Sequence, residues 1–113
     1  MKTGLLVSLI APVALIFLAG CEAYPPPPPV TPQMSAAMPK KKRVSMQTLQ
    51  EGRNLFARRC IECHTAPNLA YYSSSEWPRI IDSMSHRSNL SETQRQAILA
   101  YILAARGQRA AGL

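Results

Sequence analysis

The chain has 113 residues and a formal net charge of +7, with thirteen Lys and Arg against six Asp and Glu. Its length suits one domain with appendages. Much of the 47% hydrophobic content lies in the first twenty residues, so the remainder offers only a small core, of the size that usually needs a metal, disulfide or cofactor. Four positive charges stand together at residues 40–43, and the part that follows is nearly balanced, which argues against a nucleic-acid-binding protein.

Residues 1–20 have the pattern of an export signal, with a short positive start and an apolar run over residues 5–18. The run ends in Leu18-Ala19-Gly20-Cys21, which resembles the lipobox of bacterial lipoproteins. This resemblance implies that Cys21 is lipidated and becomes the N-terminus of the mature chain. The alternatives are an ordinary cleaved signal and an uncleaved membrane helix, for which the run is short. Glu22 stands where that family places its inner-membrane retention Asp, so the outer membrane is favoured.

Residues 21–47 have the composition of a linker, with five consecutive Pro at positions 25–29. Such a run adopts polyproline II, and roughly twenty residues of this spacer would reach about 60 Å when extended. The basic run at residues 40–43 is either a solvated stretch of charge or a contact for anionic lipid or an acidic partner. The composition therefore predicts a semi-rigid stalk that carries the folded domain.

Residues 48–113 are predicted to form an all-α domain of three to four short helices, because apolar residues recur at three- and four-residue steps without strand-like alternation. Capping-box patterns at residues 48–51, 73–76 and 91–94 mark three predicted helix starts. Gly107 is predicted to end the last helix. The apolar face of each predicted helix is, in chain order, Leu49, Gly52 and Phe56; Trp77, Ile81 and Met84; Ile98, Tyr101 and Ile102.

The segment Cys60-Ile61-Glu62-Cys63-His64 has the C-x-x-C-H spacing of covalent haem attachment. Two thiols at this spacing add across the two vinyl groups of one haem, and the His that follows reaches the iron from the proximal side. The sequence therefore predicts one haem c, bound by Cys60 and Cys63, with His64 as an iron ligand. The alternatives are a redox disulfide, although those motifs normally open a helix after a strand, and a zinc site, for which His86 is the one spare His.

These features together resemble a minimal class I cytochrome c, in which helices pack around a single haem. In that family the first helix carries a Gly and, four residues later, an aromatic residue, and both contact the last helix. Gly52 and Phe56 stand in these positions, and the matching residues of the last helix are Ile98, Tyr101 and Ile102. The resemblance further implies that the backbone carbonyl of Pro67 accepts a hydrogen bond from His64.

The family's usual distal iron ligand is Met, and Met84 is the Met between the haem motif and the last predicted helix. His86 is the rival ligand, and the two lie about 200° apart on an ideal helix, so that both cannot face the iron. An open or water-filled position is the third possibility. Trp77, Tyr71 and Tyr72 are candidate haem contacts, either through a propionate or by packing.

The resemblance implies one-electron transfer by a membrane-tethered periplasmic protein that cycles between Fe(II) and Fe(III). Its expected partners are a redox donor and a redox acceptor protein, and it is expected to be a monomer. Since both axial positions would be filled, we expect no catalytic residue and no enzymatic turnover. The alternatives are a haem-based gas sensor or small redox enzyme with an open or labile distal site, and a structural lipoprotein with a C-x-x-C disulfide.

Overall fold

A computed structural model describes residues 26–63, 65–110 and 112. The predicted export signal, Cys21 and His64 lie outside the described residues. The described residues form four α-helices and one 3₁₀ helix and contain no strand, which confirms the predicted all-α class. In chain order these are α1 (Pro32–Ala36), the 3₁₀ helix η1 (Lys40–Lys42), α2 (Met46–Arg58), α3 (Trp77–Arg87) and α4 (Glu92–Ala110). None of the helices in this part of the chain is long and apolar enough to cross a membrane.

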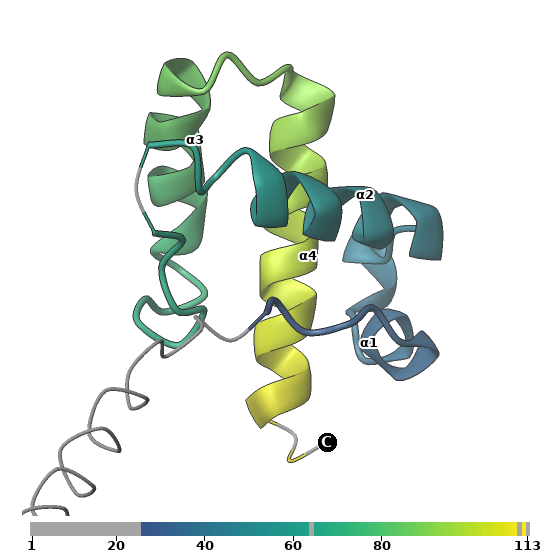
Figure 1. Ribbon diagram of the computed structural model, residues 1–113. Coiled ribbons are helices and arrows are strands. Elements are labelled where there is room, and N and C mark those ends of the chain that lie inside the picture. Colours follow the sequence, from purple (N-terminus) through teal and green to yellow (C-terminus); the bar gives the residue numbers. More distant parts are fainter. Residues whose placement is uncertain (1–25, 64, 111, 113) are drawn as a thin grey trace, which may run out of the picture.

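The helix α4 is the centre of the fold, because α1, α2 and α3 all pack against it. Figure 1 shows α2 crossing α4, with α3 and α1 on opposite flanks. A helix that is covered on several sides carries apolar residues over more than one face. The buried residues of α4 follow this rule: Ala97, Ile98, Tyr101, Ile102, Ala104 and Ala105.

The crossing of α2 over α4 depends on Gly52. A Cβ atom at this position would lie 2.0 Å from the carbonyl oxygen of Ala97 and 2.9 Å from Cβ of Tyr101, so only Gly permits the observed approach. One turn later Phe56 packs against Tyr101, with ring centroids 6.1 Å apart. The predicted contact of Gly52 and Phe56 with the last helix is therefore confirmed.

The start of α2 differs from the prediction. The side chain of Ser45 accepts a hydrogen bond from the backbone N–H of Thr48 at 3.0 Å, and the helix begins at Met46, inside the segment that was expected to be linker. Ser is a strong N-cap residue, and here it acts one turn before the capping-box pattern at residues 48–51.

The two ends of α4 differ in how well they were predicted. Ser91 and Gln94 form the reciprocal capping box: the Ser91 hydroxyl accepts from the Gln94 N–H at 3.2 Å, and the Gln94 side chain accepts from the Ser91 N–H at 3.0 Å. The predicted stop at Gly107 is wrong, because α4 continues to Ala110. The backbone of Gly107 stays helical and does not take the left-handed conformation by which Gly ends a helix.

The Pro-rich segment packs against the helices, and in this it differs from the free linker that its composition predicts. We call residues 26–44 the strap. Tyr101 donates its hydroxyl hydrogen to the carbonyl of Pro28 at 2.7 Å, and the Arg53 guanidinium donates to the carbonyls of Pro27 and Pro28 at 3.0–3.2 Å. Pro lacks an N–H but keeps its carbonyl, so a polyproline segment still offers acceptors to buried donors. Farther along the strap, Met34 is fully buried within the core.

The Tyr101 hydroxyl makes the strap sensitive to alkaline pH. Burial raises the pKa of Tyr101 to about 12, although the positive charges of Arg53 and Arg109 oppose the shift. Because the unfolded pKa is near 10, this stabilisation is present below about pH 10 and is lost as the pH rises toward 12. We expect the free energy of unfolding in urea to fall over that range by about 2 kcal/mol more in the wild type than in Tyr101→Phe.

At neutral pH, Tyr101→Phe is expected to be about 1 kcal/mol less stable than the wild type, because the Pro28 carbonyl loses one of its two donors and keeps only Arg53. Tyr71→Phe is the matched control, since the Tyr71 side chain is 79% exposed. If the free energy of unfolding depended on pH equally in the wild type and in Tyr101→Phe, folding would not raise the pKa of the Tyr101 hydroxyl.

Candidate functional site

A cavity of about 390 Å³ lies between α3, the end of α2 and the loop that carries the two cysteines. Cys60 and Cys63 line it from one side and Met84 lines it from α3. Its volume falls in the range of about 300–1,000 Å³ typical of small-molecule sites. The structure thus brings both cysteines that were predicted to attach the haem, together with the predicted distal ligand Met84, to one cavity.

One part of the cavity wall is formed by aliphatic side chains. Ile80 and Ile81 come from α3, Leu90 from the loop after it, and Ile98 from α4. Ile81 and Ile98 also belong to the buried core, so this wall is continuous with the packed interior. Such a surface favours a ligand with a large apolar part.

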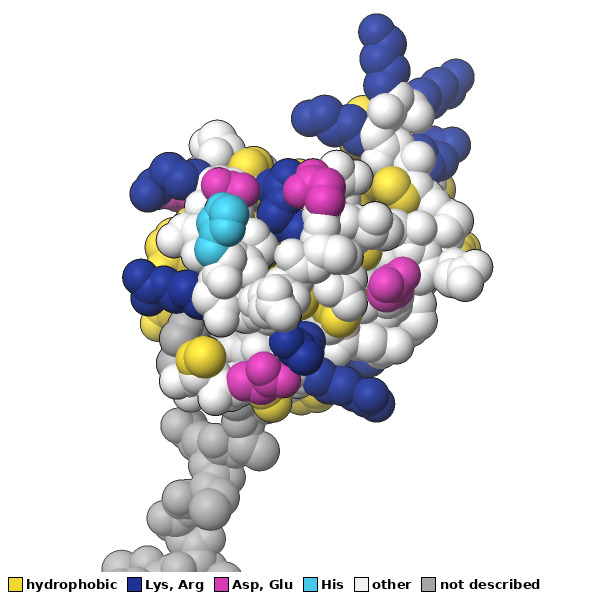
Figure 2. All heavy atoms as spheres, turned by 90° about the horizontal axis from the view of Figure 1, so that it is seen from above, with side chains coloured by type: hydrophobic (Ala, Val, Ile, Leu, Met, Phe, Trp, Pro, Cys, Tyr) yellow, Lys and Arg dark blue, Asp and Glu magenta, His cyan; other side chains and the backbone are white. Residues whose placement is uncertain are grey.

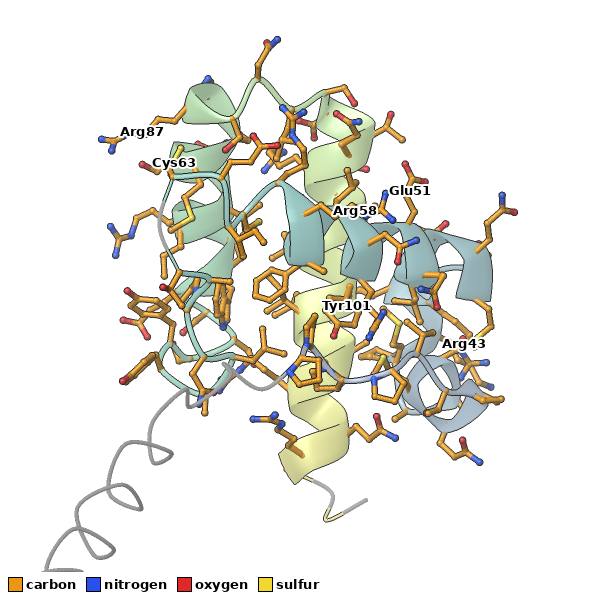
Figure 3. The ribbon with its side chains drawn as sticks, in the orientation of Figure 1. Arg43, Glu51, Arg58, Cys63, Arg87 and Tyr101 are labelled. Carbon is orange, nitrogen blue, oxygen red and sulfur yellow. The ribbon has the colours of Figure 1, made fainter. Side chains whose placement is uncertain are left out.

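The loop with the cysteines is held by Arg59, the residue that follows the last turn of α2. Its guanidinium donates to the carbonyl of Ser88 at 2.7 Å, which ties the loop to the end of α3. Cys60 is half-buried, Cys63 is exposed, and neither forms a disulfide. Figure 3 shows Cys63 beside α3, near Arg87.

The end of α3 is fixed by a Schellman motif. The Leu90 N–H donates to the carbonyl of Ser85 at 3.1 Å, and Asn89 adopts the left-handed conformation with φ 51°. The Ser88 N–H donates to the carbonyl of Met84 at 3.0 Å. This turn holds the backbone around Met84 and brings Leu90 back to the cavity wall.

The charge around the cavity is positive. Arg59, Arg79 and Arg87 line it, and no Asp or Glu does so among the described residues. The Nε of Arg59 is buried and has no hydrogen-bond partner in this part of the chain, although it lies 3.5 Å from a Glu62 carboxylate oxygen. Guanidinium groups pair readily with carboxylates, so the cavity suits a ligand that carries acidic groups.

Met84 and His86, the rival distal ligands, lie on different faces of α3. Met84 is half-buried and lines the cavity. His86 is exposed and lines a separate shallow hollow with Asp82, Glu92 and Arg95. The structure therefore brings Met84, and not His86, to the cysteines.

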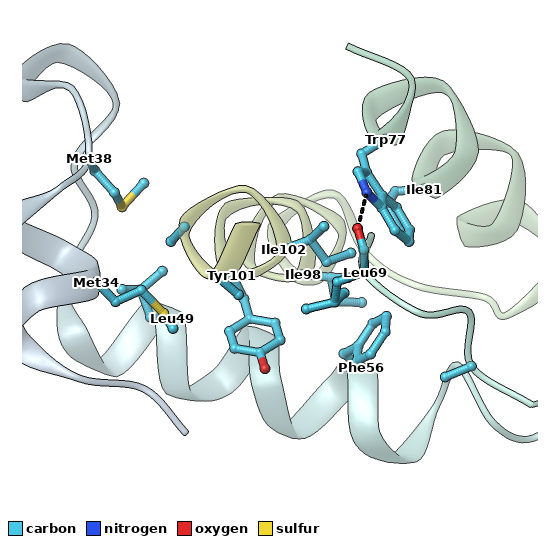
Figure 4. Close-up of a cluster of buried hydrophobic side chains, with 13 residues drawn as sticks. Met34, Met38, Leu49, Phe56, Leu69, Trp77, Ile81, Ile98, Tyr101 and Ile102 are labelled. Atoms are coloured by element: carbon cyan, nitrogen blue, oxygen red, sulfur yellow. Dashed lines mark hydrogen bonds between the residues drawn. The ribbon is translucent and has the colours of Figure 1, made fainter. Parts of the chain in front are cut away.

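The three aromatic candidates have different positions. Trp77 is fully buried and donates its indole N–H to the carbonyl of Leu69 at 3.4 Å, an oxygen that also accepts from Arg106 (Figure 4). Tyr72 lines the cavity and packs edge-on against Trp77, with ring centroids 5.4 Å apart. Tyr71 is 79% exposed and is not part of the lining. Of the three, Tyr72 is the one that lines the cavity, and it packs against the buried Trp77.

Pro67 is half-buried in the loop after the cysteines. Its expected hydrogen-bond donor, His64, lies outside the described residues.

The environment of Cys60 bears on the disulfide alternative. Burial, and to a lesser degree the charge of Glu62, raises the pKa of the Cys60 thiol to about 11. Cysteines that exchange disulfides have lowered pKa values, commonly at a helix N-terminus, whereas Cys60 follows the C-terminal end of α2. The thiol is protonated at neutral pH, which disfavours thiol–disulfide exchange.

Sequence reasoning missed the arginines of the cavity. Ile80, Met84 and Arg87 follow one another on α3 at steps of four and three residues, and Arg79 lies about two turns before Arg87 on the same face. This spacing was readable from the sequence once Met84 was chosen as a reference. The part played by Arg59 depends on its long-range bond to Ser88, for which the sequence carries no local signal.

No protein-family model matches the chain, and comparisons with curated proteins and with solved structures likewise found no match.

Proposed function

We propose that this protein is a small electron carrier of the c-type cytochrome kind, with one haem c bound covalently through Cys60 and Cys63. The observation that supports it most is the single cavity that joins both cysteines to Met84. His64 would be the proximal iron ligand and Met84 the distal one. Such a haem supplies reversible one-electron transfer between Fe(II) and Fe(III).

The residues around the cavity fit a haem. Ile80, Leu90 and Ile98 offer an apolar wall to a macrocycle and would keep water from it. Arg59, Arg79 and Arg87 offer guanidinium groups for its two propionates. The Met84 thioether, a soft ligand, would favour the reduced iron and raise the reduction potential.

We further propose a cytochrome c-like fold. The support is the close crossing of α2 and α4 at Gly52, with Phe56 packed against Tyr101 one turn later. In this arrangement α3 carries the distal residue and the loop after α2 carries the attachment motif.

The export signal and lipobox support a location on the periplasmic side of a bacterial membrane, with Cys21 as the lipid anchor and the outer membrane favoured. The partners would be one redox donor and one redox acceptor protein, met by a monomer that performs no catalytic turnover.

The distal ligand gives the sharpest test of this function. We expect the ferric protein to show the far-red charge-transfer band of sulfur-ligated haem, and Met84→Ala to abolish it. The same variant is expected to lower the reduction potential by on the order of 0.1 V, because the soft ligand is gone. Ferrous Met84→Ala should bind carbon monoxide, whereas the ferrous wild type should not. Optical spectra, potentiometric titration and carbon monoxide difference spectra check these results.

His86→Ala is the matched control and is expected to change none of the three measurements, since His86 lines a different hollow. Ready binding of carbon monoxide by the ferrous wild type would favour a gas sensor or small redox enzyme with an open distal site. Survival of the band in Met84→Ala would exclude Met84 as the ligand.

A further inference from the structure

A second apolar stripe runs along α4 and lines a groove separate from the cysteine cavity. The lining residues of α4, all apolar except Gln96, follow at steps of three and one, which places them on one helix face: Gln96, Leu99, Ala100, Leu103, Ala104 and Gly107. Leu99, Ala100 and Leu103 remain partly exposed. Part of this face of α4 is therefore left uncovered by the fold.

The strap forms the opposite wall of this groove. Met34, Ala37 and Met38 line it there, Pro78 joins them from α3, and the volume is about 460 Å³. Met side chains are flexible and adapt to the shape of an apolar ligand. The groove is thus largely apolar and is bounded mainly by two segments that lie far apart in the sequence.

The mouth of the groove carries positive charge. Lys42 lines it, and Lys40, Lys41 and Arg43 stand next to it, all with exposed side chains. Within the described residues, no Asp or Glu forms an ion pair with any of the four. Figure 2 shows Lys and Arg side chains gathered at one corner of the molecule. An apolar groove that ends at unpaired cations is complementary to an amphiphile with an anionic head.

We propose that this groove binds a long-chain fatty acid, with the hydrocarbon chain along α4 and the carboxylate at Lys42. Apolar walls favour the chain because its burial removes hydrocarbon from water. A Lys ammonium favours the carboxylate through a charge-assisted hydrogen bond. The inference concerns α4 and the strap and does not depend on the haem.

Other occupants fit less well. A second copy of the chain would bring an equal cluster of four positive charges to the same corner, and like charges repel. A partner helix is about 10 Å wide, so over the roughly 16 Å between residues 96 and 107 it would fill roughly 1,200 Å³. The groove holds about 460 Å³, which suits a single hydrocarbon chain.

Photo-crosslinking tests the site in the full-length, haem-loaded protein in vesicles of neutral phosphatidylcholine. The probe is palmitate with a diazirine in its chain. Trypsin cleaves after Arg95 and Arg106, so the peptide of residues 96–106 contains most of the α4 stripe. We expect that peptide to carry the label and unlabelled palmitate to compete it away. The haem spectrum is recorded separately, so that a failure of the haem proposal is distinguishable from a failure of this one.

Two variants separate the groove from general attraction to membranes. Lys42→Glu is expected to lower labelling on the order of tenfold, and Arg58→Glu, with the same charge change on an exposed site of α2, is expected to leave it unchanged. Leu103→Trp, which fills the groove without a charge change, should also abolish labelling. An equal loss in Lys42→Glu and Arg58→Glu would overturn the proposal, and so would equal labelling by a quaternary ammonium probe. A third outcome would also overturn the proposal: labelling that increases with anionic lipid and is not competed away by unlabelled palmitate. Such labelling would show a contact with the bilayer instead.

Discussion

Replacement of both cysteines that we propose attach the haem, as Cys60→Ser with Cys63→Ser, is expected to remove the proposed covalent haem completely and to unfold the domain. The cavity of about 390 Å³ would lose the group that fills it, and its walls of Ile80, Leu90 and Ile98 would face water or collapse. The loss of a bound group and the cavity left behind should together cost on the order of 5 kcal/mol, which is most of the stability of a small domain. Haem staining after denaturing electrophoresis and thermal unfolding followed by circular dichroism measure the two effects.

Cys21→Ser is the control for the attachment cysteines. It is expected to keep the haem stain and the melting temperature while it releases the protein from the membrane fraction. A wild-type protein without haem stain, in which Cys60 and Cys63 are joined as a disulfide, would instead support the structural lipoprotein.

Gly52→Ala is expected to be the most damaging single substitution outside the haem site. Its Cβ would lie 2.0 Å from the carbonyl oxygen of Ala97, and this neighbour is backbone, which cannot rotate away. The helices α2 and α4 would have to separate, at a cost of about 3 kcal/mol even after the better helix propensity of Ala is counted. Urea unfolding of the haem-loaded protein measures the change.

Gly107→Ala is the matched control, because both glycines lie within helices and a Cβ at Gly107 would meet nothing within 4 Å. This substitution is expected to stabilise the protein by about 0.5–1 kcal/mol. If Gly52→Ala were also neutral or stabilising, the close crossing of α2 and α4 would not be a feature of the protein in solution.

Features with a local physical cause were predictable from the sequence. Leu49, Gly52 and Phe56 follow one another at steps of three and four residues. Because a helix repeats every 3.6 residues, this spacing correctly predicted the buried face of α2. The capping box of Ser91 and Gln94 gave the start of α4, because its hydrogen bonds are made within one turn. Met84 and His86 are about 200° apart on an ideal helix, and this angle correctly predicted that they lie on different faces of α3.

Features that depend on distant contacts were not predictable in this way. Arg53 and Tyr101 hold the strap by donating hydrogen bonds to the carbonyl of Pro28. Both lie far from Pro28 along the chain, so no local sequence pattern predicts these bonds. Trp77 was one of three candidate haem contacts, and the acceptor of its indole N–H, the loop carbonyl of Leu69, could not be predicted from the sequence. Composition indicates polyproline II for a run of consecutive Pro, but it did not predict the short helices α1 and η1 within the strap or the packing of the strap against other elements.

The strap also decides where this protein would find its partners. Between Cys21 and Pro26 there are five peptide steps, which span at most about 18 Å even when fully extended. If Cys21 carries acyl chains, as proposed, the packed strap leaves the domain close to the lipid headgroups, far short of the reach of a free stalk. Encounters would then follow lateral diffusion in the plane of one leaflet, where confinement raises the effective concentration of neighbours. An electron donor or acceptor held at that same surface would then meet this protein more often than one free in solution.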